Sequence, residues 1–187
     1  MALSSLFARR TDVQDPATWT PPGTTVVQRY RNTLGDQEGA IVLVYTADGD
    51  RGTSYFAAAC LGCTFRATRN SHGSVRLSES DAAALANSHA ASCRAMNRGV
   101  PASPDDDQAA TIVRSRLRGL REYGTTRAHC VSLSDFHEDR VDLQRPASFI
   151  KQTMHQLVQK EPGFVTSEPD SIGTGTRFLV QPHPPRS

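Results

Sequence analysis

Lysine, aromatic residues and long apolar runs are scarce in this sequence, and each shortage narrows the range of possible structures. Only Lys151 and Lys160 are lysines among the 21 basic residues, and aromatic residues make up 6% of the 187 positions. A hydrophobic content of 37% is low for one large core and favours small cores joined by polar linkers. No apolar run approaches the roughly 20 residues of a membrane-spanning helix, so we expect no membrane partner.

Charge and cysteine content give the first expectations about compartment and ligands. The formal net charge of +2 is too small to predict a nucleic-acid partner by itself. The N-terminal stretch MALSSLFARRTDVQ places its charges after a very short apolar patch, the reverse of a secretory signal, so we expect a cytoplasmic protein. In that compartment the four cysteines favour metal binding or free thiols over disulfides. Arginine in place of lysine, with abundant alanine, is typical of a GC-rich bacterial genome.

The distribution of proline, glycine and charge predicts an α+β protein with two folded parts. Residues 1–23 end in DPATWTPPG, which indicates an irregular N-terminal arm. The stretch NRGVPASPDD, residues 97–106, combines prolines, a glycine and acidic residues and predicts a linker. We therefore expect a β/α module over residues 24–96 and a second domain over residues 107–182.

In the first module, three segments rich in β-branched and aromatic residues predict antiparallel strands, separated by the turn sequences GDQEG and DGDRG. These strands are expected over residues 24–30, 40–47 and 53–59, with a fourth, short strand over 64–69. Ser78 precedes Asp81 by three residues, which is the spacing of a capping box at the start of a helix. The alanine-rich sequence that follows predicts a helix from about Glu79 to Met96.

Four potential metal ligands occur in this module as two closely spaced pairs. Cys60 and Cys63 are separated by two residues, so a tight turn can direct both sulfurs at one ion, and Gly62 supplies backbone freedom in that turn. His89 and Cys93 are four residues apart on the predicted helix, which places them on one face. Three thiolates and one imidazole suit tetrahedral Zn²⁺, and four protein ligands leave no position open for a substrate. The pattern therefore predicts a structural zinc site.

Residues 53–96 resemble a ββα zinc finger in which a final cysteine replaces the second histidine. The resemblance implies a β-hairpin and a helix held together by zinc. Three alternatives remain open at this point: buried free cysteines beside a surface histidine, His72 as the fourth ligand in place of His89, and an iron–sulfur cluster. His72 lies in a predicted loop without a partner at helical spacing, so we favour His89.

The second half alternates helical and strand patterns. Apolar residues at helical spacing, a possible cap at Ser134, Pro146 at a first-turn position and a glycine-rich segment define the expected elements. These are helices over 109–124, 134–141 and 146–160, a strand over 129–133, a turn over 142–145, and a hairpin formed by GFVTSE and RFLVQP.

This order of elements resembles the winged helix-turn-helix pattern of bacterial DNA-binding regulators across residues 107–182. The resemblance implies that residues 146–160 form a recognition helix and that the partner is double-stranded DNA, read in a sequence-specific manner. Glutamine can pair with adenine edges, and lysine or arginine can reach guanine or phosphate. The residues implied to contact DNA are Arg145, Ser148, Lys151, Gln152, His155, Gln159 and Arg177.

Two other functions are compatible with the sequence. The chain could be a non-enzymatic adaptor that uses both modules against proteins, and the zinc module could also mediate a homodimer. A thiol nucleophile is the enzymatic alternative, because Cys130 is next to His129. Adjacent residues of a strand point to opposite faces, so we expect that Cys130 is a small core residue and that the protein is not an enzyme.

Overall fold

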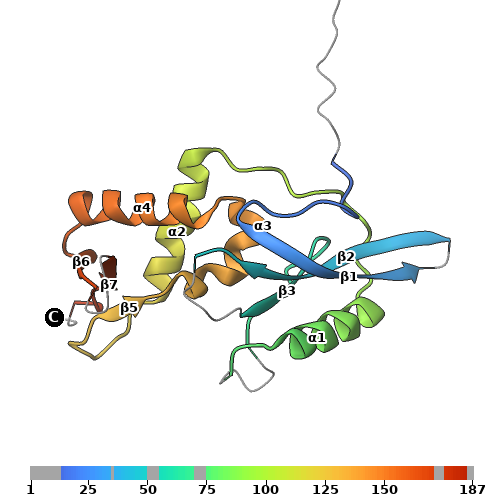
Figure 1. Cartoon of the computed structure of the whole chain (residues 1–187), viewed down its shortest axis with the longest axis horizontal. Helices are drawn as coiled ribbons and strands as arrows, with labels where there is room; N and C mark the ends of the chain where they lie inside the picture. The colour runs from blue at the N-terminus through green and yellow to red at the C-terminus, as the bar shows by residue number, and fades with distance from the viewer. Residues whose placement is uncertain (1–13, 35, 50–54, 70–74, 171–174, 185–187) are drawn as a thin grey trace, which may run out of the picture.

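The computed structural model describes residues 14–34, 36–49, 55–69, 75–170 and 175–184 of the chain. Within these residues the fold is α+β, with two antiparallel sheets and helices packed against them (Figure 1). In that part of the chain no helix combines the length and the apolar character that a bilayer crossing requires.

The first sheet has the strand order β1-β2-β3-β4, and every neighbouring pair is antiparallel. Its strands are β1 (Thr24–Leu34), β2 (Gln37–Ala47), β3 (Phe56–Cys60) and β4 (Arg66–Ala67). Strand β2 is buried on both faces, because helix α1 (Glu79–Ser92) covers one face and Trp19, together with Val141 of the C-terminal half, packs on the other. In Figure 1 the sheet lies between α1 and the short helix α3.

The strands expected over 24–30, 40–47 and 53–59 correspond to β1, β2 and β3. Ser78 caps α1 as predicted: its hydroxyl accepts a bond from the Asp81 N–H, and the Asp81 carboxylate accepts one from the Ser78 N–H. The helix ends at Ser92 rather than near Met96, because Cys93 turns to extended backbone at φ −68° and ψ 132°.

The second half contains a helical layer and a three-stranded sheet of order β5-β7-β6. The elements are α2 (Asp106–Gly119), β5 (His129–Val131), the 3-10 helix η1 (Leu133–Asp139), α3 (Arg140–Leu143), α4 (Ala147–Lys160), β6 (Val165–Pro169) and β7 (Thr176–Val180). Apolar residues of α2 and α4 pack together with Phe136 and Phe178 in one core.

Several details of this half differ from the predictions. The helix expected over 109–124 begins earlier, at Asp106, and ends earlier, at Gly119. The helix expected over 134–141 is mostly 3-10, and Ser132, not Ser134, provides its cap. The turn expected over 142–145 begins inside α3 and is completed by Gln144, which has the left-handed φ of 47°. Pro146 precedes α4 as its N-cap rather than occupying the first turn. The tip of the predicted hairpin, residues 171–174, lies outside the described residues.

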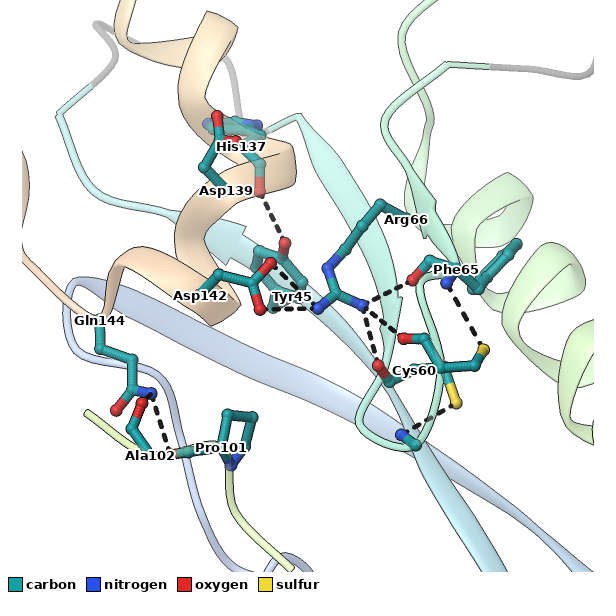
Figure 2. Close-up of polar contacts among 12 residues, drawn as sticks. Tyr45, Cys60, Phe65, Arg66, Pro101, Ala102, His137, Asp139, Asp142 and Gln144 are labelled. Carbon is teal, nitrogen blue, oxygen red and sulfur yellow. Dashed lines mark hydrogen bonds and ion pairs between the residues drawn. The ribbon is translucent and has the colours of Figure 1, made fainter. Parts of the chain in front are cut away.

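The two halves of the chain meet in a shared apolar core and through several polar contacts. Val141 of α3 is buried with Trp19, Leu43 and other residues on the second face of the first sheet. The hydroxyl of Tyr45 donates to the His137 carbonyl at 2.6 Å (Figure 2). The domain boundary expected over residues 97–106 remains a prediction. The parts of the chain before and after it are packed against each other.

Candidate metal centre

The four predicted metal ligands lie together. The ligand atoms of Cys60, Cys63, His89 and Cys93 are all within 4.8 Å of one another. The Cys63 sulfur is 3.3 Å from the His89 Nε2 and 3.9 Å from the Cys93 sulfur. Distances of this order place all four atoms around one point, so the cluster can hold a metal ion.

Three backbone segments direct the ligands. Cys60 ends β3, Cys63 follows in the turn, and His89 and Cys93 come from the last turn and the C-cap of α1. Two of the cysteine sulfurs accept a weak N–H···S hydrogen bond from the backbone two residues later. The Gly62 N–H donates to Cys60 at 3.4 Å, and the Ala95 N–H donates to Cys93 at 3.4 Å. Such bonds stabilise sulfur in its anionic form, which is the form that binds metal.

Burial sets the protonation of the free ligands. It raises the pKa of the Cys60 thiol to about 11, with an opposing effect of the Gly62 N–H and a further rise from the neighbouring Cys63. Burial also lowers the pKa of His89, so that the ring is neutral and able to donate a lone pair near neutral pH. A bound dication would favour the thiolate form of the cysteines over the thiol form, because a coordinated cysteine is deprotonated.

The chemistry of the donor set matches a closed structural site. Soft sulfur and imidazole ligands are those that Zn²⁺ prefers, and four of them complete its tetrahedral coordination. The site joins the end of β3 to the end of α1, and these two elements also pack together through Ala58, Ala86 and other members of one core.

Gly62 serves the site in a different way from the prediction. Its φ is not in the left-handed region. A methyl group added there would lie 2.9 Å from the Ala95 Cβ, 2.9 Å from the Met96 carbonyl oxygen and closer still to the Ala40 Cβ. The turn needs glycine because neighbouring chain segments leave no room for a side chain.

Phe65 and Arg66, two and three positions after Cys63, contact the ligand segments but are not ligands themselves. The Phe65 ring stacks on the His89 ring, with centroids 3.9 Å apart and planes inclined by 8°. The Arg66 guanidinium donates to the carbonyls of Cys60, Cys63 and Phe65 at 2.8, 3.2 and 2.9 Å (Figure 2). The same side chain pairs with the Asp142 carboxylate of α3 at 2.9 Å. This ion pair links the segment that carries Cys60 and Cys63 to the second half of the chain.

Most of the residues predicted to contact DNA share the outer face of α4. Ser148, Lys151, Gln152, His155 and Gln159 are all exposed, while the opposite face of the helix is buried. The His155 ring meets Phe178 edge-on, with centroids 4.8 Å apart.

The two arginines predicted to hold phosphates contact carboxylates of their own chain. Arg145 pairs with Asp106 at 2.9 Å and also donates to the Pro104 carbonyl. Arg177 is exposed at the start of β7 and pairs with Glu168 of β6. Each arginine would therefore have to leave its carboxylate partner, or share it, in order to bind a phosphate.

The remaining candidates are separated from the metal cluster. The expectation that Cys130 is a core residue is wrong, because its side chain is exposed on β5. The flanking His129 is half-buried and lies 3.6 Å from the Asp135 carboxylate. This alternation agrees with side chains on opposite faces of a strand. His72, the alternative metal ligand, lies outside the described residues.

Comparison with known proteins found no matching family model, no matching curated protein and no matching solved structure. The sequence and geometry of this chain therefore carry the functional argument.

Proposed function

We propose that this protein is a sequence-specific DNA-binding protein with a structural zinc site, and that it acts as a bacterial transcriptional regulator. The observation that carries the proposal is the outer face of α4, where five polar side chains capable of base or phosphate contacts are exposed in a row. A helix of this kind fits the major groove, in which glutamine can read adenine and lysine can read guanine.

The arrangement around α4 supports the same function. The elements follow one another as helix, strand, helix, turn, helix and two strands, and β5 joins the sheet beside β7. This order agrees with a winged-helix domain whose hairpin, β6 and β7, forms the wing. Arg177 lies at the described edge of that hairpin, close in sequence to its tip.

The zinc site has a supporting role in this proposal. It binds no substrate, because all four coordination positions belong to the protein. Mass spectrometry of the native protein tests this part, with one zinc per chain as the expected result. Apoprotein alone, or a melting temperature unchanged by a strong chelator, would contradict it.

Selection from a random DNA library, followed by titrations at rising salt, tests DNA binding. We expect a preferred sequence, and an affinity that falls as salt rises because phosphate contacts release counterions. The double variant Lys151→Ala and Gln152→Ala should lose at least tenfold in specific affinity, since one good base contact contributes about 1–3 kcal/mol of discrimination.

Lys160→Ala is the matched control for that variant. Lys160 is also an exposed lysine of α4, but it lies at the last residue of the helix, outside the predicted reading face. Both variants should melt at the wild-type temperature, because none of the three side chains is buried. Equal losses of affinity in the two variants would reject α4 as the reading element.

A protein–protein adaptor is the second candidate, and one observation favours it. Arg145 and Arg177 are neutralised by Asp106 and Glu168, which reduces the positive charge available to phosphates. Absence of any selected sequence, together with binding that ignores salt, would favour the adaptor over the regulator.

A further inference from the structure

A cleft of about 170 Å³ opens where the two halves of the chain meet, away from both the metal cluster and the outer face of α4. Tyr55, Arg69 and Arg76 line it from the first half. His137 and Glu138 of η1 and Arg116 of α2 are among the residues that line it from the second half. Its chemistry is not used by the proposed function.

Arg69 and Arg76 place two positive charges side by side. They are partners in an isolated antiparallel β-bridge, so their side chains leave the backbone on the same face. Like charges directly opposite each other in such a pair are destabilising. Within the described part of the chain, neither guanidinium has a carboxylate partner, and Arg76 instead lies over the Tyr55 ring, 4.4 Å from its centroid.

His137 adds a buried polar group to the same cleft. His137 is only 3% exposed, and its Nε2 has no hydrogen-bond partner among the described residues. Burial and the nearby charges of Arg140 and Arg76 lower the pKa of His137 to about 4, so the ring is neutral at pH 7. In one tautomer a neutral imidazole can donate from Nε2.

The carboxylates at the cleft are already engaged. Glu138 accepts from the Thr68 hydroxyl at 2.9 Å with one oxygen and pairs with Arg116 at 2.9 Å with the other. Asp135 accepts the Ser132 N–H at 2.8 Å. Arg116 is held by Glu138 and by Asp139, so the charges left without a partner are those of the bridged arginines.

We propose that this cleft binds a small oxyanion, namely a phosphate group that is either free or the terminal group of a small molecule. Arg69 and Arg76 bind the anion from two sides, and His137 donates a further hydrogen bond. Guanidinium groups match phosphate oxygens in geometry and in charge, and binding relieves the repulsion between the two arginines. Because both halves of the chain line the cleft, the anion also contacts both.

The test is a titration of the zinc-loaded, full-length protein with inorganic phosphate at constant ionic strength, using chloride as the balancing salt. Binding is followed by calorimetry and by the melting temperature, which rises when a ligand binds only the folded state. We expect phosphate to bind with release of heat and to raise the melting temperature. A nucleoside monophosphate and the corresponding nucleoside form the second arm and distinguish a free from an attached phosphate group.

Arg69→Gln is the decisive variant, because it removes one of the facing charges and leaves the contact between Arg76 and Tyr55 in place. Without phosphate it should melt at or above the wild-type temperature, which excludes misfolding, and its affinity for phosphate should fall at least tenfold. Arg118→Gln, an exposed arginine of α2 outside the cleft, is the control and should bind as the wild type does. The proposal is overturned if neither phosphate nor the nucleotide binds, or if the two variants lose affinity equally.

Discussion

Gly62, in the turn between the first two cysteines, is a residue whose replacement should damage the metal centre through packing alone. In Gly62→Ala the new methyl group would meet Ala40, Ala95 and the Met96 carbonyl. We expect a loss of about 1–3 kcal/mol in the free energy of unfolding, as for other overpacked sites, and a lower zinc occupancy. Urea denaturation and metal analysis measure the two effects.

Gly119→Ala is the control for this substitution. Gly119 is the last residue of α2, and an added methyl group there would meet nothing within 4 Å. Alanine favours helix over glycine by about 0.5–1 kcal/mol, so this variant should be as stable as the wild type or more so. If both alanine variants behaved alike, the packing explanation of Gly62 would be wrong.

His137 should make the stability of the protein depend on pH. Its pKa is about 4 in the folded chain and about 6.5 in the unfolded chain, so below pH 6.5 the unfolded chain takes up a proton that the folded chain does not. The contribution of His137 to the free energy of unfolding is therefore fully present above pH 6.5. It decreases as the pH falls toward 4, by about 3 kcal/mol in all.

Urea denaturation in phosphate-free buffer between pH 5 and 7.5, with the zinc content measured at each pH, would measure this decrease. In His137→Gln the slope of stability against pH should be smaller over that interval. His155→Gln, which changes an exposed histidine of α4, should keep the wild-type slope. An unchanged slope in His137→Gln would mean that other groups cause the pH dependence.

Among single residues, the sequence could identify the candidate metal ligands but not the residues that support them. Cys60, Cys63, His89 and Cys93 are recognisable because metal coordination imposes regular spacings on a turn and a helix. Phe65 and Arg66 follow no such rule, since one stacks on a ring 24 positions away and the other bonds to backbone carbonyls. Backbone acceptors exist at every position and leave no mark in a sequence.

Helix α1 should depend on the proposed metal more than the other long helices do. The residues that it buries are Ala82, Ala86 and Ala90, whereas α4 buries Ile150, Met154 and Leu157 among others. Alanine contributes little apolar area, at roughly 0.8 kcal/mol for each buried methylene-sized group. Packing alone should therefore hold α1 weakly.

Removal of the metal should loosen α1 first. With a chelator we expect hydrogen exchange to become much faster in α1, while α2 and α4 keep most of their protection. Cys63→Ser should reproduce the chelated state, and Cys130→Ser should match the wild type, because Cys130 is exposed on β5 away from the cluster. Full protection of α1 in verified apoprotein would contradict the prediction.

The sequence predicted the long elements well and the short ones poorly. The capping box at Ser78 and the β-branched and aromatic residues of the strands are local signals, and α1 and β1 to β3 follow them. Helix α3 has only four residues and is fixed by burial of Val141 against the first sheet. No local pattern could predict it, because its stabilising contacts lie about a hundred residues away in the chain.

For the molecule as a whole, Asp48 joins the two halves directly through its carboxylate. It lies in the turn after β2, and its carboxylate accepts the Ala147 N–H at the start of α4 at 3.0 and 3.1 Å. Pro146 provides no side-chain cap for that helix, so Asp48 performs this role from 99 positions away. The same carboxylate pairs at 2.9 Å with Arg140, whose side chain is fully buried.

Asp48→Ala should therefore be costly for a half-exposed residue. Loss of a cap costs about 1 kcal/mol, and loss of the partner of a buried charge costs more, reduced here because the Asp48 side chain is 42% exposed. We expect a total of about 2–4 kcal/mol by urea denaturation. Glu122→Ala, an exposed carboxylate in the loop after α2, should change stability by less than about 0.5 kcal/mol.

A double-mutant cycle with Arg140→Met separates the two contributions of Asp48. If the ion pair accounts for most of the effect, the cost of Asp48→Ala should be much smaller in the Arg140→Met background. If capping accounts for most of it, the cost should be the same in both backgrounds. Near-wild-type stability of Asp48→Ala itself would show that neither contact matters.

The covering of the first sheet by Val141 has a consequence for how the chain is made. A ribosome completes β2 at Ala47 and must add a further 94 residues before Val141 exists, which takes on the order of ten seconds at about 5–20 residues per second. During that interval the nascent sheet carries an apolar face around Ile41, Leu43 and Tyr45 with nothing from α3 to shield it. Chaperones that recognise such faces should therefore engage this protein during its synthesis and release it when its C-terminal half emerges.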